Sequence, residues 1–210
     1  LFPYTTLFRS RDLVGFVEPR KPFSEGKRFY NSVAILKNGK IEGIVRKSLL
    51  PNYSEFNDYR YMEPSPIIGV QPAETLCDFS ADKVCDSNIV YKLNGIKYGI
   101  SICEDLWNNK DFFEKNLYDS DPIAELKKAG ADVIINCSAS PTRARKEQLK
   151  HNMLAFTAFS HKIPIVYVNQ VGAIDNISFD GASRGVNKYG DLFARAKSFE
   201  EDFIILNPIN

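Results

Sequence analysis

Short apolar segments separated by turn residues make up the first half of the chain. Their pattern predicts strands over residues 13–18, 32–37, 40–45, 87–93 and 97–103, which are rich in β-branched and aromatic residues. The dipeptides Asn38-Gly39 and Asn94-Gly95 separate two neighbouring pairs of these segments. Asn-Gly is the dipeptide most typical of a tight β-hairpin turn, so antiparallel strand pairs are predicted here.

The pattern changes in the second half, where helical and extended segments alternate. It predicts a helix near 122–129, a strand over 131–138, a helix over 146–160 and a strand over 163–170. Such alternation is typical of crossover connections between parallel strands. The predicted fold class is therefore α/β with layered, mixed sheets, and one domain over residues 11–210 is the simplest division.

Two regions of this second half need separate interpretations. The segment 169–191 is rich in Gly, Asn and Asp, which predicts turns between short strands rather than a phosphate-binding loop. In helix 146–160, a broad apolar stripe is predicted to pack in the core. The stripe consists of Leu149, Met153, Leu154, Phe156, Ala158 and Phe159.

Composition and charge narrow the class of protein further. With 44% hydrophobic and 25% charged residues, the 210-residue chain can bury one substantial core. A net charge of +1 gives no long-range reason to expect nucleic acid or a membrane as partner. No apolar stretch is long enough to span a bilayer, and four cysteines with two histidines indicate neither a disulfide scaffold nor zinc. We expect a cytoplasmic protein.

The first ten residues, LFPYTTLFRS, are excluded from this interpretation. They resemble the translation of a DNA-sequencing adapter and match no protein element that we can place. We therefore expect the natural sequence to start near Arg11 and to be cut on its upstream side. The alternative is a genuine strand-like N-terminus.

Cys103 ends an apolar segment in the run GISICEDLW (99–107). The end of a strand can expose a side chain at the edge of a sheet, where catalytic groups are commonly placed. A free cysteine in an apolar strand is more often an inert core residue. Position alone therefore makes Cys103 a candidate nucleophile and leaves the core interpretation open.

Two further segments follow predicted strands and carry polar groups. RKSLLPNYSEFNDYR (46–60) places Lys47 at a strand end, where an ammonium group can stabilise the oxyanion that forms when a thiolate attacks a carbonyl. The alternative is a solvated lysine. NCSASPTRARK (136–146) combines hydroxyl and basic residues that can bind an amide or a carboxylate, or can simply cap the next helix.

Taken in order, seven segments resemble the nitrilase superfamily and, within it, the glutaminase domains of glutamine-dependent NAD synthetases. They are VGFVEP (14–19), YNSVAIL (30–36), KSLLPNYSEF (47–56), ICEDLW (102–107), NCSASP (136–141), VYVNQVG (166–172) and FDGAS (179–183). The resemblance implies a four-layer αββα sandwich, N-terminally truncated here, and a Glu-Lys-Cys triad that hydrolyses the amide of glutamine.

Site residues follow from the resemblance by motif position. Cys103 is the nucleophile and Lys47 the oxyanion-stabilising lysine, while Asp58 supports Lys47 where the family often has a second glutamate. The expected glutamine-binding residues are Tyr53, Glu104, Ser140 and Lys146. Arg143 and Arg145 are the alternatives to Lys146.

Besides Asp58, the chain departs from the family pattern in three places. The family's general base is a glutamate in an FPE-like motif that is not found here, and Glu18 lies in a different motif. Because a positioned base commonly contributes about 10²–10⁴-fold, we expect the chain as written to release no ammonia from glutamine. Ala173 replaces a glycine, and the stretch between Met62 and Asn88 fits poorly and is interpreted as a variable surface loop.

The resemblance also implies partners. Ammonia would pass to an ATP-dependent synthetase domain of the same chain, which converts nicotinic acid adenine dinucleotide to NAD and holds ATP and Mg. No cofactor or metal is expected in the glutaminase domain itself, and a homo-oligomer is expected. Two alternatives remain: a stand-alone carbon–nitrogen hydrolase acting on another small amide, and a non-catalytic nitrilase-like module.

Overall fold

The structure, a computed structural model, describes residues 11–20, 25–65 and 90–209. Its helices are α1 (Asp58–Tyr61), α2 (Pro122–Lys128), α3 (Lys146–His161) and the single 3₁₀ turn η1 (Cys103–Leu106). Its strands are β1 (Arg11–Pro19), β2 (Phe29–Lys37), β3 (Lys40–Arg46), β4 (Val90–Leu93), β5 (Ile96–Ile102), β6 (Val133–Ser138), β7 (Ile165–Asn169), β8 (Val171–Ile174), β9 (Ile177–Asp180), β10 (Arg184–Val186) and β11 (Leu192–Arg195).

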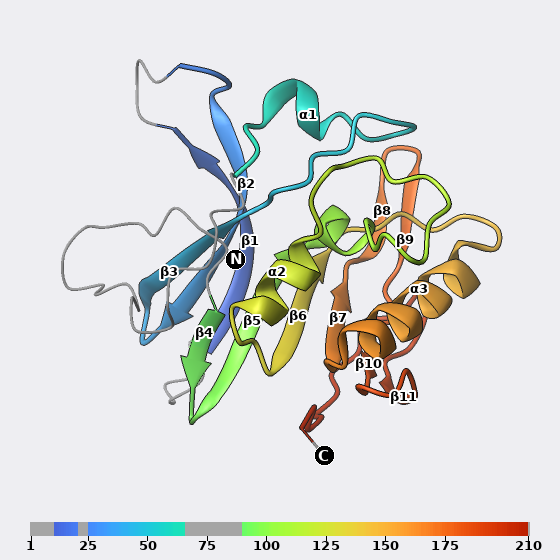
Figure 1. The fold of residues 1–210 in the computed structure, drawn as a ribbon. Helices are drawn as coiled ribbons and strands as arrows, with labels where there is room; N and C mark the ends of the chain where they lie inside the picture. The colour runs from blue at the N-terminus through green and yellow to red at the C-terminus, as the bar shows by residue number, and fades with distance from the viewer. Residues whose placement is uncertain (1–10, 21–24, 66–89, 210) are drawn as a thin grey trace.

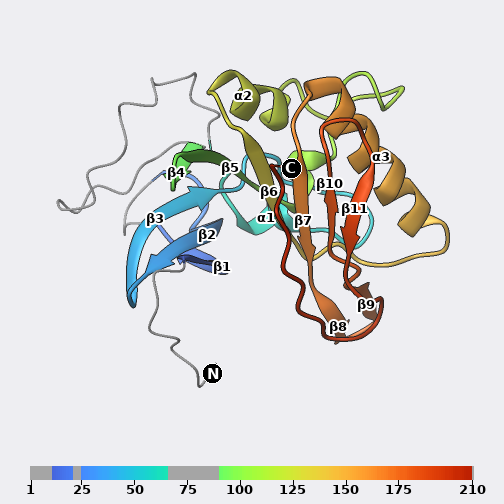
Figure 2. The ribbon, with the colours of Figure 1, turned by 90° about the horizontal axis from the view of Figure 1, so that it is seen from below.

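A six-stranded sheet with the order β11-β10-β7-β6-β5-β4 forms the centre of the structure (Figure 1). β5, β6 and β7 run parallel, and α2 and α3 are the crossovers between them, as the alternating pattern predicted. Both helices lie over the same face of the sheet (Figure 2). The core between them and the sheet is apolar and includes Ile123, Leu126, Ile134, Met153, Leu154, Ile165 and Val186.

The antiparallel sheet β1-β2-β3 packs on the opposite face of the large sheet, near β5. Val33 and Val45, which are directly paired across β2 and β3, form a second buried cluster with Ile100 and Ile102 of β5. Alternating residues of a strand point to opposite faces, and on the helix side of β5 the backbone of Gly99 lies close to Leu126 and Ile134. The described residues thus form three layers: helices, the six-stranded sheet and the three-stranded sheet.

The two predicted Asn-Gly hairpins are confirmed. Asn38 and Gly39 have φ values of 50° and 73° between β2 and β3, and Asn94 and Gly95 have 50° and 86° between β4 and β5. Positive φ at both central residues is the type I′ geometry, whose twist matches that of the flanking strands. Residues 87–89 of the fourth predicted strand lie outside the described residues.

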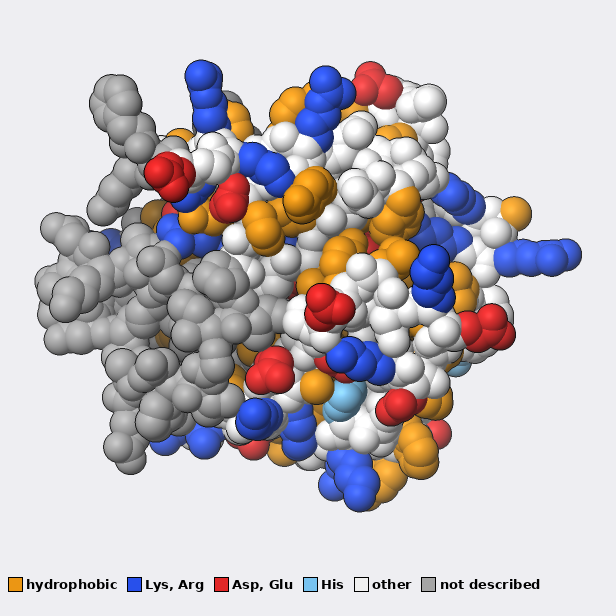
Figure 3. Space-filling view, turned by 45° about the horizontal axis from the view of Figure 1, so that its top comes forward, with side chains coloured by type: hydrophobic (Ala, Val, Ile, Leu, Met, Phe, Trp, Pro, Cys, Tyr) orange, Lys and Arg blue, Asp and Glu red, His pale blue; other side chains and the backbone are white. Residues whose placement is uncertain are grey.

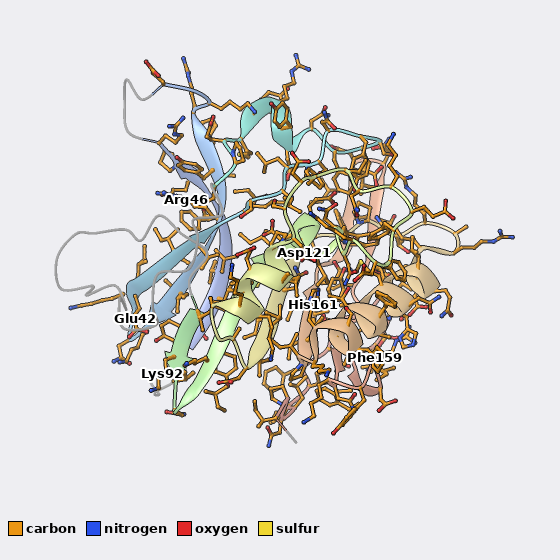
Figure 4. The ribbon with its side chains drawn as sticks, viewed as in Figure 1. Glu42, Arg46, Lys92, Asp121, Phe159 and His161 are labelled. Carbon is orange, nitrogen blue, oxygen red and sulfur yellow. The ribbon has the colours of Figure 1, made fainter. Side chains whose placement is uncertain are left out.

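The prediction for the buried face of α3 was partly wrong. Leu149 and Phe159 are 42% and 61% exposed, and Phe159 is labelled on α3 in Figure 4. Met153, Leu154 and Ala158 are buried as predicted, and Lys150 and Thr157 complete the buried face at the three- and four-residue spacing of one helix side. A charged residue therefore occupies a position that hydrophobicity alone assigned to the solvent side.

The predicted turns and short strands of segment 169–191 are confirmed by β8, β9 and β10. The pattern missed β11, which pairs antiparallel with β10 at the edge of the large sheet. Cys77 and Cys85, and most of the stretch interpreted as a variable loop, lie outside the described residues.

Candidate active site

The predicted site residues gather at one edge of the large sheet. Cys103 directly follows β5, Ser140 lies two residues beyond β6, and Lys47 directly follows β3 of the neighbouring sheet. The carboxyl ends of parallel strands meet at the same edge, and residues that follow them are brought together although they are distant in the sequence. Parallel pairing of β5 with β6 therefore brings Cys103 and Ser140 to the same end of the sheet.

Cys103 stands at a sharp change of direction between β5 and η1. Its φ is 43°, in the left-handed region that non-glycine residues rarely adopt. The Asp105 carboxylate secures this turn, because it accepts hydrogen bonds from the backbone N–H groups of Ile102 at 2.9 Å and of Leu49 at 2.9 Å. The turn that presents the thiol is thus bonded to the segment that carries Lys47.

The Lys47 ammonium is buried and is held by Asp58. Its Nζ lies 2.5 Å from an Asp58 carboxylate oxygen. Burial alone would lower the pKa of Lys47, but the charges of a Cys103 thiolate and of Asp58 raise it, and the net shift is upward. Lys47 is therefore a cation whose charge acts directly on the sulfur.

Burial has the opposite consequence for the thiol. It raises the pKa of Cys103, the neighbouring Lys47 ammonium lowers it, and the Glu104 carboxylate raises it; the net shift is upward. Cys103 is only 8% exposed. At neutral pH the thiol keeps its proton, so a nucleophilic role requires a base that removes it.

Glu104 is a buried carboxylate beside the thiol, and two tyrosines donate hydrogen bonds to it. The Tyr53 hydroxyl lies 2.8 Å from one carboxylate oxygen, and the Tyr118 hydroxyl lies 3.0 Å from the same oxygen. Burial raises the pKa of Glu104, although both hydrogen bonds lower it. The Glu104 carboxylate is thus held in place at the cavity wall, where it can bind a cation.

A cavity of about 420 Å³ opens over these groups. Its walls include Cys103, Glu104, Tyr53, Ser140 and Lys146, five of the seven predicted site residues. Volumes of about 300–1,000 Å³ are typical of small-molecule sites. The cavity also has Glu55, Phe56, Trp107, Arg143 and Arg145 in its walls.

Lys146 supplies positive charge on the side of the cavity formed by the start of α3. Its Nζ lies 5.6 Å from the ring centre of Phe56 and 5.5 Å from that of Trp107. Burial lowers its pKa. Within the described ranges no carboxylate pairs with this ammonium, whereas Arg143 pairs with Glu55 across the loops that line the cavity. The cavity therefore presents an anionic group and a cationic group to a ligand.

Glu18, which the sequence interpretation left without a catalytic role, is engaged elsewhere. Its carboxylate accepts hydrogen bonds from Arg46 at 2.8 Å and from Ser32 at 2.8 Å. Arg46 lies on β3 (Figure 4). Burial would raise the pKa of Glu18, but the hydrogen bonds from Arg46 and Ser32 lower it, and the net shift is downward. The Glu18 carboxylate thus joins β1 to β2 and β3 of the small sheet.

Sequence reasoning missed four residues that shape this region: Asp105, Tyr118, Lys150 and Asp180. Burial raises the pKa of Asp105 to about 6, although backbone N–H groups of Leu49 and Ile102 lower it. The available signal for Lys150 was its spacing, since it lies three and four residues before Met153 and Leu154 on the buried face of α3. Nothing near Tyr118 in the sequence indicated a contact with Glu104.

Across residues 11–20, 25–65 and 90–209, no three His, Cys, Asp or Glu side chains are grouped so that they could hold a metal ion. No described helix is long and apolar enough to cross a membrane. On the face shown in Figure 3, basic and acidic side chains are interspersed. The expectation that this domain uses no cofactor stays a prediction.

Comparison with known proteins places this geometry in a family. A family model described as carbon-nitrogen hydrolase matches residues 13–207. A glutamine-dependent NAD(+) synthetase from Synechocystis is 32% identical over 197 residues, which is 93% of this chain and 32% of that protein. The chain therefore spans about a third of the length of this relative.

Solved structures give the same result for the fold. A glutamine-dependent NAD+ synthetase from Acinetobacter baumannii matches with a TM-score of 0.70 and 31% identity, covering 91% of this chain and 30% of that one. A carbon-nitrogen hydrolase from Helicobacter pylori matches with a TM-score of 0.67 and 22% identity, covering 91% and 59%. The predicted nitrilase-like α/β fold is confirmed.

Proposed function

The chain belongs to the carbon-nitrogen hydrolase family, and we propose that its cavity binds glutamine and that Cys103 hydrolyses the side-chain amide. The observation that carries this proposal is that one cavity contains a cysteine beside a buried ammonium group and also two side chains of opposite charge. Cys103 lies within the field of Lys47, and the same cavity contains Glu104 and Lys146. An amide that bears both an ammonium and a carboxylate matches these groups.

The proposed reaction has two halves. A base takes the proton of the Cys103 thiol, and the thiolate attacks the amide carbon to give a tetrahedral oxyanion, which the Lys47 ammonium stabilises. The base returns the proton to the nitrogen, the carbon–nitrogen bond breaks, and ammonia leaves a thioester. Water then attacks the thioester and releases glutamate and the free thiol.

Recognition of the amino-acid end follows from charge. The Glu104 carboxylate, oriented by Tyr53 and Tyr118, would bind the α-ammonium group of glutamine. Lys146, whose ammonium contacts ring faces, and the hydroxyl of Ser140 would bind the α-carboxylate. An amide without these two charges would leave Glu104 and Lys146 unmatched, so glutamine is favoured over a simple amide.

The base of this reaction is assigned to neither carboxylate that acts on Cys103. Asp58 is bonded to Lys47, and Glu104 accepts bonds from two tyrosines. Moving Asp58 to the thiol would leave the buried Lys47 ammonium unpaired, at a cost of about 1–3 kcal/mol. Moving Glu104 would break its hydrogen bonds from both tyrosines. This supports the prediction that the chain as written does not turn glutamine over, although its pocket binds it.

We extend the proposal to the parent enzyme through its relatives. The two NAD synthetases are named as glutamine-dependent. Ammonia released at Cys103 would serve an ATP-dependent synthetase domain of the same chain, with ATP and Mg bound there, to amidate nicotinic acid adenine dinucleotide. A cytoplasmic homo-oligomer that binds neither nucleic acid nor membrane belongs to the same proposal.

Protection of Cys103 from alkylation tests glutamine binding without requiring turnover. The 210-residue chain is treated with iodoacetamide, and modification of the peptide that contains Cys103 is followed by mass spectrometry. Glutamine is expected to slow this modification in a saturable manner. Modification of Cys137, which is partly buried outside the cavity lining, serves as the internal control and should not respond.

Propionamide and glutamine separate the candidate functions. Protection by propionamide equal to that by glutamine would reject glutamine recognition in favour of a small-amide hydrolase. No protection by any amide would favour the non-catalytic module. Ammonia release by the purified chain that is abolished by Cys103→Ala would contradict the predicted lack of turnover and leave the binding proposal intact.

A further inference from the structure

Behind the cavity, α3, β7 and the end of β9 are joined by a buried polar network. Lys150 Nζ lies 2.6 Å and 2.8 Å from the two carboxylate oxygens of Asp180. Asn169 Nδ2 donates to Asp180 Oδ1 at 3.1 Å. Lys150 is 0% and Asp180 2% exposed, so this ion pair is shielded from solvent.

The network reaches the cavity through the backbone of Ser140. Asn169 Oδ1 accepts a hydrogen bond from the Ser140 backbone N–H at 2.9 Å, and Asn169 Nδ2 faces the Ser140 carbonyl at 3.4 Å. Ser140 is itself 2% exposed and lines the cavity. The side chain of Asn169 therefore connects the ion pair to a wall of the proposed substrate site.

Hydrogen-bond acceptors fix which way the Asn169 amide points: Asp180 Oδ1 and the Gly181 carbonyl each accept from Asn169 Nδ2 at 3.1 Å. An ionised carboxylate only accepts hydrogen bonds, so Asp180 requires the NH₂ group of Asn169 on its side. The carbonyl oxygen of Asn169 must then face the Ser140 N–H. Lys150 pairs with Asp180 here, because burying a carboxylate without a partner is costly.

We propose that Lys150, Asp180 and Asn169 form a positioning network that holds Ser140 in place and thereby sets the affinity of the cavity for the α-carboxylate end of glutamine. None of the three touches the reacting atoms. The network acts through the orientation of the Asn169 amide, and the acceptor at position 180 matters more than its charge. This inference rests on the proposed function.

Two double variants separate acceptor from charge. Lys150→Met with Asp180→Asn removes both charges but keeps an oxygen that can accept from Asn169. Lys150→Met with Asp180→Leu removes the charges and the acceptor while keeping a similar volume. Replacing a buried ion pair by neutral groups of similar size is often tolerated, so both variants are expected to fold.

The measurement is the glutamine concentration that gives half-maximal protection of Cys103 from iodoacetamide. We expect a change of less than about twofold for Lys150→Met with Asp180→Asn. We expect an increase of about tenfold for Lys150→Met with Asp180→Leu, which is the loss of affinity expected when one hydrogen bond to the ligand is lost. Alkylation of Cys103 without glutamine should be the same in both variants, a result that a general loss of packing would not give.

Asn169→Ala provides an independent test, since it leaves the ion pair intact and removes the contact with Ser140. It should also raise the half-protection concentration about tenfold. Wild-type affinity in Asn169→Ala, or an equal loss in the two double variants, would overturn the network. If glutamine fails to protect the wild-type chain, the proposed function fails instead, and the two failures are thereby distinguished.

Discussion

Lys47 and Lys150 are both buried, and each faces an aspartate, yet their surroundings differ. Lys47 contacts one oxygen of Asp58, whose side chain is 25% exposed. Lys150 contacts both oxygens of Asp180, whose side chain is 3% exposed. The Lys47 charge acts on the Cys103 sulfur, whereas Asp180 passes its constraint to Asn169. A lysine–aspartate pair thus places a positive charge beside the thiol in the case of Lys47, and holds neighbouring groups in position in the case of Lys150.

The role of a buried lysine depends on the environment of its carboxylate partner. An ammonium that has a partly solvated partner and a titratable neighbour can respond to a reaction, because charge can form beside it. An ammonium whose partner is fully bonded has no such freedom and contributes geometry. Mutations that treat the two lysines alike should therefore have unlike effects.

The largest expected difference concerns stability. Lys150→Met leaves the Asp180 carboxylate buried and unpaired, which should lower the free energy of unfolding by about 3–5 kcal/mol. Lys47→Met leaves Asp58 able to reach water and should lower it by about 1 kcal/mol. Urea unfolding followed by circular dichroism measures both. Equal losses in the two variants would remove the distinction between the pairs.

A second expected difference concerns the reactivity of Cys103 and its dependence on pH. The pKa of this thiol is raised above its usual value, chiefly by burial, so the thiolate fraction and the alkylation rate should still be rising at pH 9. Lys47→Met removes the charge that lowers this pKa and should slow alkylation at pH 8 by about tenfold.

The control for this reactivity test is the charge-free double variant, Lys150→Met with Asp180→Asn. It should alkylate at the wild-type rate at each pH, because the charges that shift the pKa of Cys103 most are those of Lys47, Glu104 and Asp58. A comparable slowing in that variant would show that the two lysines act alike on Cys103.

The smallest expected effect concerns the hydrogen bond from Tyr118 to Glu104 at the cavity wall. Tyr118→Phe removes one hydrogen bond from Glu104 and should raise the pKa of that carboxyl further, since burial already raises it. The ionised form, which is the one proposed to bind the ammonium group of glutamine, is lost as pH falls through the raised pKa. We therefore expect the glutamine concentration for half-protection to rise about three- to fivefold, more at pH 6 than at pH 8.

Protection assays at both pH values provide the measurement for Tyr118→Phe. Tyr59→Phe is a suitable control, because Tyr59 is exposed and its ring lies 3.5 Å from the Lys27 ammonium. A Tyr118→Phe effect that does not change with pH would indicate altered packing and would contradict the electrostatic account.

Most of the fold could be predicted from the sequence, because it follows from local pattern. The Asn-Gly turns and the alternation of strands and helices depend on backbone preferences and on spacing within a few residues. The ordered motifs, through their resemblance to a family, also singled out Cys103, Lys47 and Glu104. What failed was the buried face of α3, because hydrophobicity assigns a lysine to solvent unless its partner is known.

The sequence alone determined the strand and helix pattern, the hairpin turns and a set of candidate residues. Tertiary structure alone decided which charges meet. Lys150 and Asp180 are 30 residues apart, and Tyr53 and Glu104 are 51 residues apart. These groups come from different elements, because Tyr53 follows β3 and Glu104 follows β5. Lys150 lies on α3 and Asp180 ends β9, so only packing of the layers brings each pair together. Electrostatic energy depends on distance in space and on burial, and local sequence patterns specify neither.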